Sequence, residues 1–130
     1  MIINPYWLAG FTTGEGCFLI RTTKNTNSIT LRFKLTQHIR DAELLQYIEQ
    51  YLNCGAYYPS GDIGDFVVSN FLDIKEKIIP FFDKYSILGT KHLDYLDFKQ
   101  AASLVDKKEH LTVEGSAKIL SLKAGMNRGR

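Results

Sequence analysis

The chain has 130 residues, 45% of them hydrophobic, with eight Phe, seven Tyr and one Trp, which is enough for one domain with its own core and excludes a disordered chain. Sixteen basic and fourteen acidic residues leave a formal net charge of +2, so a nucleic-acid surface would have to arise by segregating charge, not by excess. Two cysteines without CxxC spacing predict free thiols in a reducing compartment, and the absence of any apolar run of about 20 residues excludes a membrane span.

The first predicted element is a helix over residues 5–13. Asn4 can cap its first turn, and Pro5 suits the first helical position, whose N–H has no partner within a helix. Leu8 and Phe11 fall on the side of this helix that we expect to face the core.

The opposite side of that helix forms a narrow seam in which an aromatic residue is followed by small residues: Tyr6, Gly10 and Thr13. Small residues let a second helix approach closely, so the seam predicts a dimer interface. Glu15 stands between Gly14 and Gly16, where the helical pattern changes to an extended one. A close partner helix would bring its own carboxylate to nearly the same point, and two adjacent carboxylates suit a divalent metal ion.

Two hairpins are predicted by alternating apolar and polar residues. The first joins a strand that starts after Glu15 to one over residues 29–36, through a connection at residues 24–27. The second joins residues 56–60 to residues 65–69 through a turn at residues 61–64. One apolar and one polar face per strand is typical of an antiparallel sheet with one face buried.

Helices are predicted between and after the hairpins. Asp41 can cap a helix that runs to about Leu52, with Gly55 in the left-handed position that ends it. Three more follow over residues 73–82, 91–106 and 112–124, with Pro80 expected to break or bend the first of them near its end. The resulting class is α+β, with the order αββαββ followed by helices, in a single domain over residues 1–130.

The outward faces of the two hairpins gather Arg, Lys, Thr, Asn and Ser side chains, as readout of a DNA major groove by a β-ribbon requires. The candidate DNA-binding residues are Arg21, Thr23, Asn25, Ser28, Thr30, Arg32, Lys34, Thr36, Tyr58, Ser60 and Asp62. A merely solvated sheet face would show the same alternation, and the pattern alone leaves that alternative open.

Residues 8–16, Leu-Ala-Gly-Phe-Thr-Thr-Gly-Glu-Gly, resemble the signature of the LAGLIDADG homing endonucleases. Thr13 stands where the signature has an acid, and Glu15 replaces the usual Asp but keeps the carboxylate. The resemblance extends through most of the chain, including residues 36–38 and 75–80. It implies an αββαββα domain whose saddle-shaped sheet, with helices on one face, lies along double-stranded DNA.

The resemblance also implies residue roles. Glu15, with Gly14 beside it, matches the metal position; Gln37 matches a residue that orients water; and Lys91 matches a basic residue near the scissile phosphate. Arg40 is a weaker basic candidate. Mg²⁺ is the expected cofactor and Mn²⁺ a substitute, whereas Ca²⁺ is expected to bind without supporting efficient cleavage.

The predicted function is therefore metal-dependent, site-specific double-strand cleavage of a long, pseudo-palindromic DNA site by a homodimer paired through helix 5–13. By resemblance the location is organellar, with the mitochondrion as the expected organelle. Two alternatives remain open: an intron-RNA maturase that does not cleave, and a half-domain, resembling the C-terminal half of a two-motif enzyme, that needs its other half. A structural or protein-binding domain is a more distant alternative.

Overall fold

The computed structural model describes residues 3–22 and 28–127. The elements run in the order α1 Pro5–Glu15, β1 Gly16–Thr22, β2 Ile29–His38, a 3-10 turn Ile39–Asp41, α2 Ala42–Leu52, β3 Ala56–Ser60, β4 Ile63–Val68, α3 Phe71–Asp73, a π-helical turn Ile74–Ile78, α4 Ile79–Lys84, α5 Thr90–Asp106, a 3-10 turn Glu109–Leu111 and α6 Val113–Gly125. The predicted α+β class and the αββαββ order are confirmed.

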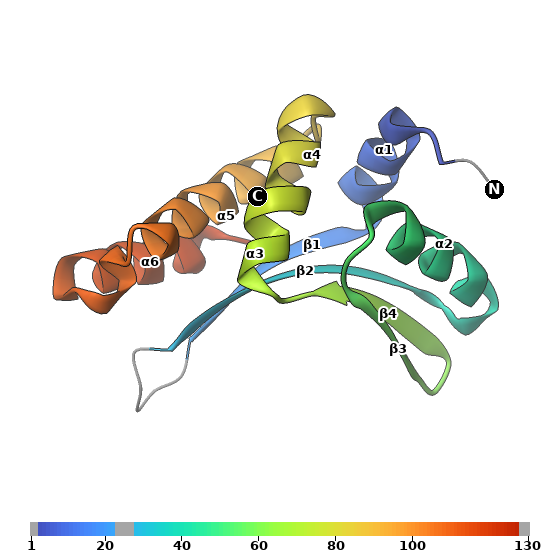
Figure 1. Ribbon diagram of the computed structural model, residues 1–130, viewed down its shortest axis with the longest axis horizontal. Coiled ribbons are helices and arrows are strands. Elements are labelled where there is room, and N and C mark those ends of the chain that lie inside the picture. Colours follow the sequence, from blue (N-terminus) through green and yellow to red (C-terminus); the bar gives the residue numbers. More distant parts are fainter. Residues whose placement is uncertain (1–2, 23–27, 128–130) are drawn as a thin grey trace.

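The four strands form one antiparallel sheet in the order β1-β2-β4-β3. The strands arch, the helices lie on one side of the sheet, and the other side is uncovered (Figure 1). Cα partners such as Gly16↔Leu35 and Phe33↔Val68 set the register, so buried residues of neighbouring strands lie side by side beneath the helices.

An aromatic cluster forms the centre of the core. Phe18 of β1 is fully buried, and its ring centroid lies 5.3 Å from Phe33, 5.9 Å from Phe82, 5.4 Å from Tyr95 and 5.1 Å from Phe98. These partners come from β2, α4 and α5, so one side chain joins the sheet to the helices that cover it.

The beginning of the chain folds as its sequence predicts. The Asn4 side chain accepts hydrogen bonds from the Tyr6 and Trp7 backbone N–H groups at 2.8 and 3.3 Å, so it caps α1. Leu8 is fully buried and Phe11 is half-buried against the core. The helix is longer than predicted, however, because it continues to Glu15.

The second hairpin is tighter than predicted. Gly61 and Asp62 alone connect the strands, and β4 begins at Ile63, so the expected four-residue turn is wrong. Gly61 has φ of +60°, a conformation that glycine adopts without the steric cost of a Cβ atom. Asp62 consequently lies in the turn and not on a strand, where its carbonyl accepts a hydrogen bond from the Ile39 N–H.

The helix α2 begins and ends where predicted, but the details of both caps need correction. Asp41 occupies the N-cap position, but its side chain makes no capping hydrogen bond. The left-handed residue that ends the helix is Asn53, with φ of 54°, because the chain turns immediately after Leu52. Gly55 also has positive φ (+81°), where the backbone enters β3.

Pro80 does not end its helix. Residues 71–84 are continuously helical, and the turn just before Pro80 is widened, with the Ile79 N–H bonded to the Ile74 carbonyl. A wider turn accommodates a residue that lacks an N–H and whose ring would meet the preceding turn. Of the predicted break or bend at Pro80, the break is therefore wrong, since the helix continues through the π-helical turn and past the proline.

The segment at the end of α6 covers the outer edge of β1. The Asn127 side chain donates to the Phe18 carbonyl at 2.8 Å, and its backbone N–H donates to the Asp94 carboxylate at 3.1 Å. These bonds cover part of an edge strand that would otherwise present unpaired backbone groups.

Cys17 and Cys54 are free thiols, as predicted. Burial raises the pKa of Cys54 to about 11. Among the described residues, no helix is long and apolar enough to cross a membrane.

Replacing Phe18 with Ala should lower the free energy of unfolding by about 3–5 kcal/mol, because the cavity would open in the aromatic cluster. Urea denaturation followed by circular dichroism measures this loss. Leu72→Ala is the matched control: this side chain is 59% exposed, and its loss should change stability by no more than about 0.5 kcal/mol. Equal effects of the two substitutions would contradict the assigned core.

Candidate functional site

Glu15 is the last residue of α1, and the turn after it has little steric freedom. The Gly16 N–H bonds to the Thr12 carbonyl, and a Cβ atom at Gly16 would lie 2.5 Å from Thr12 Cγ2 and 2.8 Å from Thr12 O. Only glycine fits there without a shift of the backbone. The backbone of Glu15, whose side chain is exposed, is therefore held directly before β1 starts.

Lys91 reaches the same turn from the first turn of α5. Its Nζ donates a hydrogen bond to the Gly16 carbonyl at 2.5 Å, although the residues are 75 positions apart in sequence. A cation in the first turn of a helix is disfavoured by the helix dipole. The ammonium is instead held one residue from Glu15 by a carbonyl at the end of α1.

The register between β1 and β2 brings Gln37 to the same end of the sheet as Glu15 and Lys91. Gly16 pairs with Leu35, so Gln37 lies two residues farther along β2, alongside the end of α1. It is half-buried, and its Nε2 donates to the Thr36 carbonyl at 2.9 Å. The fold thus gathers the three predicted catalytic residues at one end of the sheet. Arg40 lies in the 3-10 turn beyond β2 and is exposed.

Glu15 is the carboxylate that the sequence predicts as a metal ligand in this site. In the part of the chain that the structure describes, no three His, Cys, Asp or Glu residues are grouped to hold a metal. The exposed Glu15, with Gly14 before it, offers oxygen donors of the kind that Mg²⁺ prefers, but too few of them. Glu15 alone offers fewer ligands than a divalent ion needs, and its assignment as a metal ligand stays a prediction.

The seam of α1 is largely open to solvent. Tyr6 is 72% exposed, and a Cβ atom at Gly10 would meet no heavy atom within 4 Å. Trp7, which sequence reasoning did not single out, is also 43% exposed and stacks on Phe11 with ring centroids 5.1 Å apart. Assignment of the seam as an interface remains a prediction that these exposures support.

The third seam residue, Thr13, is engaged within its own chain. Its hydroxyl donates to the Ala9 carbonyl at 2.9 Å and accepts a hydrogen bond from the Leu88 N–H at 3.2 Å. The same loop leads into α5, so Thr13 and Gly16 both tie α1 to the segment that carries Lys91.

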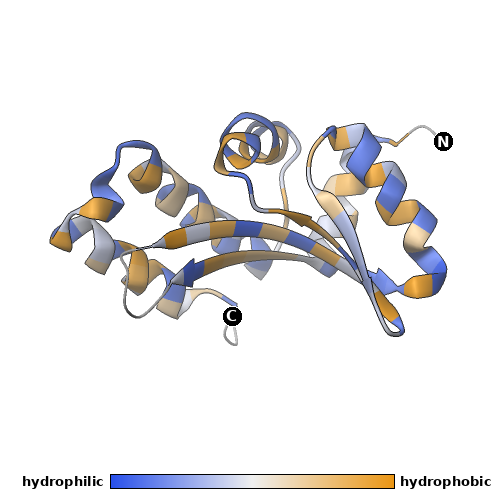
Figure 2. Cartoon of the chain, turned by 60° about the horizontal axis from the view of Figure 1, so that its bottom comes forward, coloured by the Kyte–Doolittle hydropathy of each residue, from blue (hydrophilic) through white to orange (hydrophobic). Residues whose placement is uncertain are grey.

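The uncovered face of the sheet carries most of the predicted DNA-binding residues. Alternation along β1 and β2 places these described residues away from the core: Arg21, Thr30, Arg32, Lys34 and Thr36. Figure 2 shows the alternation as bands of hydrophilic and hydrophobic residues along the strands. Tyr58 is 58% exposed, and Ser28, Ser60 and Asp62 are exposed, whereas the predicted positions Thr23 and Asn25 lie outside the described residues.

Asp65 is a residue of this face that sequence reasoning missed. It pairs with both Thr36 and Tyr58 in the sheet, and its carboxylate accepts a hydrogen bond from the Thr36 hydroxyl at 2.6 Å. Asp65 meets Thr36 because of the register between β2 and β4, which the sequence does not show. The one signal in the sequence was the alternation within β4, which puts Asp65 on the polar face. This bond uses the one hydrogen that the Thr36 hydroxyl can donate.

The family of the chain follows from its sequence as well as its geometry. A model of the LAGLIDADG endonuclease family matches residues 8–102. The chain belongs to the LAGLIDADG family. Over 119 residues it is 44% identical to probable intron-encoded endonuclease 2 of Neurospora crassa, an alignment that covers 90% of this chain and 26% of that protein.

Solved structures of LAGLIDADG enzymes share the whole fold. I-GzeII in complex with its DNA target superposes with a TM-score of 0.96 at 37% identity, covering 100% of this chain and 46% of that chain. I-SmaMI bound to uncleaved DNA in the presence of calcium ions superposes at 0.90 with 41% identity, covering 97% and 45%. The chain thus spans less than half the length of these LAGLIDADG proteins and about a quarter of the N. crassa relative.

Thr13→Val should leave the Leu88 N–H without its acceptor and lower the free energy of unfolding by about 1–3 kcal/mol. Amide hydrogen exchange at Leu88, followed by NMR, should accelerate. Thr13→Ser keeps the hydroxyl and should retain the slow exchange. An unchanged Leu88 exchange rate in the valine variant would show that this bond does not hold the loop.

Proposed function

We propose that this LAGLIDADG unit takes part in site-specific, metal-dependent double-strand cleavage of DNA, in an organelle of its host. The observation that carries the proposal is the convergence of Glu15, Gln37 and Lys91 at the end of the sheet from which the polar open face extends. The neighbours I-GzeII and I-SmaMI are described in complex with DNA, which supports DNA as the ligand.

DNA would lie along the uncovered face. Arg21 and Arg32 have the donor geometry for guanine, and the hydroxyl and lysine side chains suit phosphates and bases. An open, arched face without helices leaves room for a duplex (Figure 1). A symmetric pair of such faces would favour a long, pseudo-palindromic site.

Glu15 would hold Mg²⁺ or Mn²⁺ together with a second carboxylate of the same kind. A bound divalent ion lowers the pKa of the attacking water and neutralises charge on the leaving oxygen. Gln37 would orient that water from β2, and Lys91 would stabilise negative charge at the phosphate. The Gly16 carbonyl keeps the Lys91 ammonium in place beforehand, which reduces the reorganisation needed during the reaction.

The second carboxylate would come from another unit of the same fold, paired through the seam of α1. A homodimer supplies it from a second copy of this chain. The coverage of about 46% of the I-GzeII chain supports the other arrangement, in which two units share one polypeptide. Both place Tyr6 and Gly10 at the contact.

Glu15→Gln should lower single-turnover cleavage about a hundred- to a thousandfold, because the substitution keeps the shape but removes the charge that holds the metal. Binding to the same DNA in Ca²⁺, measured by gel shift, should persist, since losing a carboxylate also removes repulsion from phosphate. The substrate is a supercoiled plasmid carrying a site selected from random sequence.

Glu114→Gln is the matched control, since Glu114 is an exposed acid in the first turn of α6, and cleavage should be unchanged. Cleavage by Glu15→Gln at the wild-type rate would refute the catalytic assignment. A wild-type protein that binds structured intron RNA but never nicks DNA would instead support a maturase function, which the intron-encoded relatives make the second candidate.

Gly10→Leu should separate folding from pairing. The site is open within one chain, and replacing a mid-helix glycine should stabilise the single unit by about 0.5–1 kcal/mol. The same side chain would wedge a partner helix away at a cost of about 1–3 kcal/mol or more per site. Sedimentation equilibrium and thermal unfolding measure the two effects, with Gly10→Ala as the smaller step. A Gly10→Leu variant that pairs like the wild type would place the interface elsewhere.

A further inference from the structure

A groove of about 490 Å³ lies where the uncovered face of the sheet meets α6. Four cationic side chains contribute to its lining: Arg21 from β1, Arg32 and Lys34 from β2, and Lys123 from α6. Leu19 and Thr22 form part of the remaining wall, and none of the described residues that line the groove is acidic. Several positive charges without a counter-charge attract an anion.

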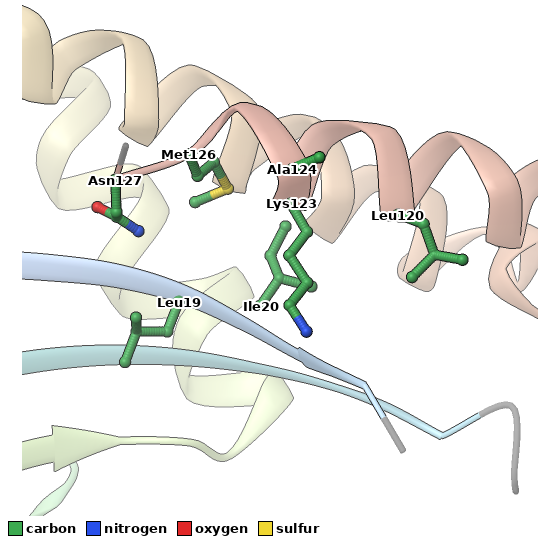
Figure 3. Close-up of a pocket in the computed structure, with 7 residues that line it drawn as sticks. All are labelled: Leu19, Ile20, Leu120, Lys123, Ala124, Met126 and Asn127. Carbon is green, nitrogen blue, oxygen red and sulfur yellow. The ribbon is translucent and has the colours of Figure 1, made fainter. Parts of the chain in front are cut away.

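Lys123 is the residue of this groove that neither the sheet pattern nor the family signature indicated. Its side chain extends from α6 toward the end of β1 (Figure 3), where Nζ donates to the Thr22 hydroxyl at 3.1 Å. That partner is neutral, and an ammonium has three N–H donors. The bond therefore holds the charge at the rim of the sheet without neutralising it.

Arg32, which lines the groove, has an unpartnered donor. Its Nε is shielded from solvent and has no hydrogen-bond acceptor among the described residues. A buried donor on a charged group costs free energy unless an acceptor arrives. On the same strand, Thr36 already has an acceptor in Asp65, so the acidic residue lies toward the other end of the face.

We propose that this groove binds a phosphate of the DNA backbone, with Lys123 as its anchoring cation. The inference rests on the proposed function, because it requires DNA along the open face. Thr22 lies seven residues beyond Glu15 on an extended strand, about 24 Å at 3.4 Å per residue. Successive phosphates of one strand are 3.4 Å apart along the axis, so a duplex whose axis follows β1 would have the contacted phosphate about seven base pairs from the scissile one.

The test is DNA binding in Ca²⁺ over a range of salt concentrations, using a duplex selected from random sequence. Lys123→Ala should reduce the slope of log K against log[salt] by about 0.9, the value for one lost phosphate contact. The ratio of wild-type to Lys123→Ala affinity should therefore fall about 3.5-fold when the salt concentration is raised fourfold. Base preference in a repeated selection should stay unchanged, because phosphate contacts carry no direct sequence information.

Lys118→Ala is the control, since Lys118 is an exposed lysine of α6 that lines a different pocket, and it should leave the slope unchanged. Lys123→Arg should restore the wild-type slope. A scan of single neutral methylphosphonates should find one position, about seven base pairs from the cleavage point, where substitution removes the difference between wild type and Lys123→Ala.

Equal slopes for the two alanine variants, or the absence of such a position, would overturn the inference while leaving DNA binding intact. Tight binding of inorganic phosphate that depends on Lys123, together with unchanged DNA binding in Lys123→Ala, would assign the groove to a free anion and also overturn it. A wild-type protein that binds no DNA would refute the proposed function itself.

Discussion

The turn at Gly16 is the constraint on which the rest of this structure depends. Its N–H closes α1 on Thr12, its carbonyl accepts the Lys91 ammonium, and its position pairs with Leu35 in the sheet. A side chain there would overlap with Thr12. One residue without a Cβ atom thus sets the direction in which the helix becomes a strand and the point at which Glu15 is presented.

In the sheet that begins at this turn, alternation along the strands puts apolar side chains on one face and polar side chains on the other. Residues such as Phe18 and Phe33 build the aromatic core, and the intervening residues form a polar face that the helices leave open. A chain with a formal net charge of only +2 obtains a basic surface in this way. The charge is also graded along the face, with cations around the groove at α6 and Asp65 farther along β2 and β4.

The segment from Tyr85 to Lys91, which links α4 to the first turn of α5, connects the exposed seam to the site. Tyr85 packs edge-on against Tyr6 with ring centroids 5.0 Å apart, Leu88 bonds to Thr13, and Lys91 bonds to Gly16. These three contacts are spread along α1, from its first turn to the residue that ends it. A partner helix on the seam would therefore touch the same helix that positions the basic residue.

The sequence by itself determined the order of elements, the capped first helix, the alternating hairpins and the carboxylate at the helix end, because each depends on neighbours within a few positions. The sequence did not predict that a π-helical turn would accommodate Pro80 without ending the helix. It also placed the left-handed residue that ends α2 at Gly55, whereas Asn53 occupies that position. Only the tertiary structure decided that Lys91 meets Gly16, that Asp65 bonds to Thr36 and that Lys123 joins the basic groove. Those contacts join residues from 29 to 101 positions apart. Strand register and helix packing, which no local pattern encodes, bring them together.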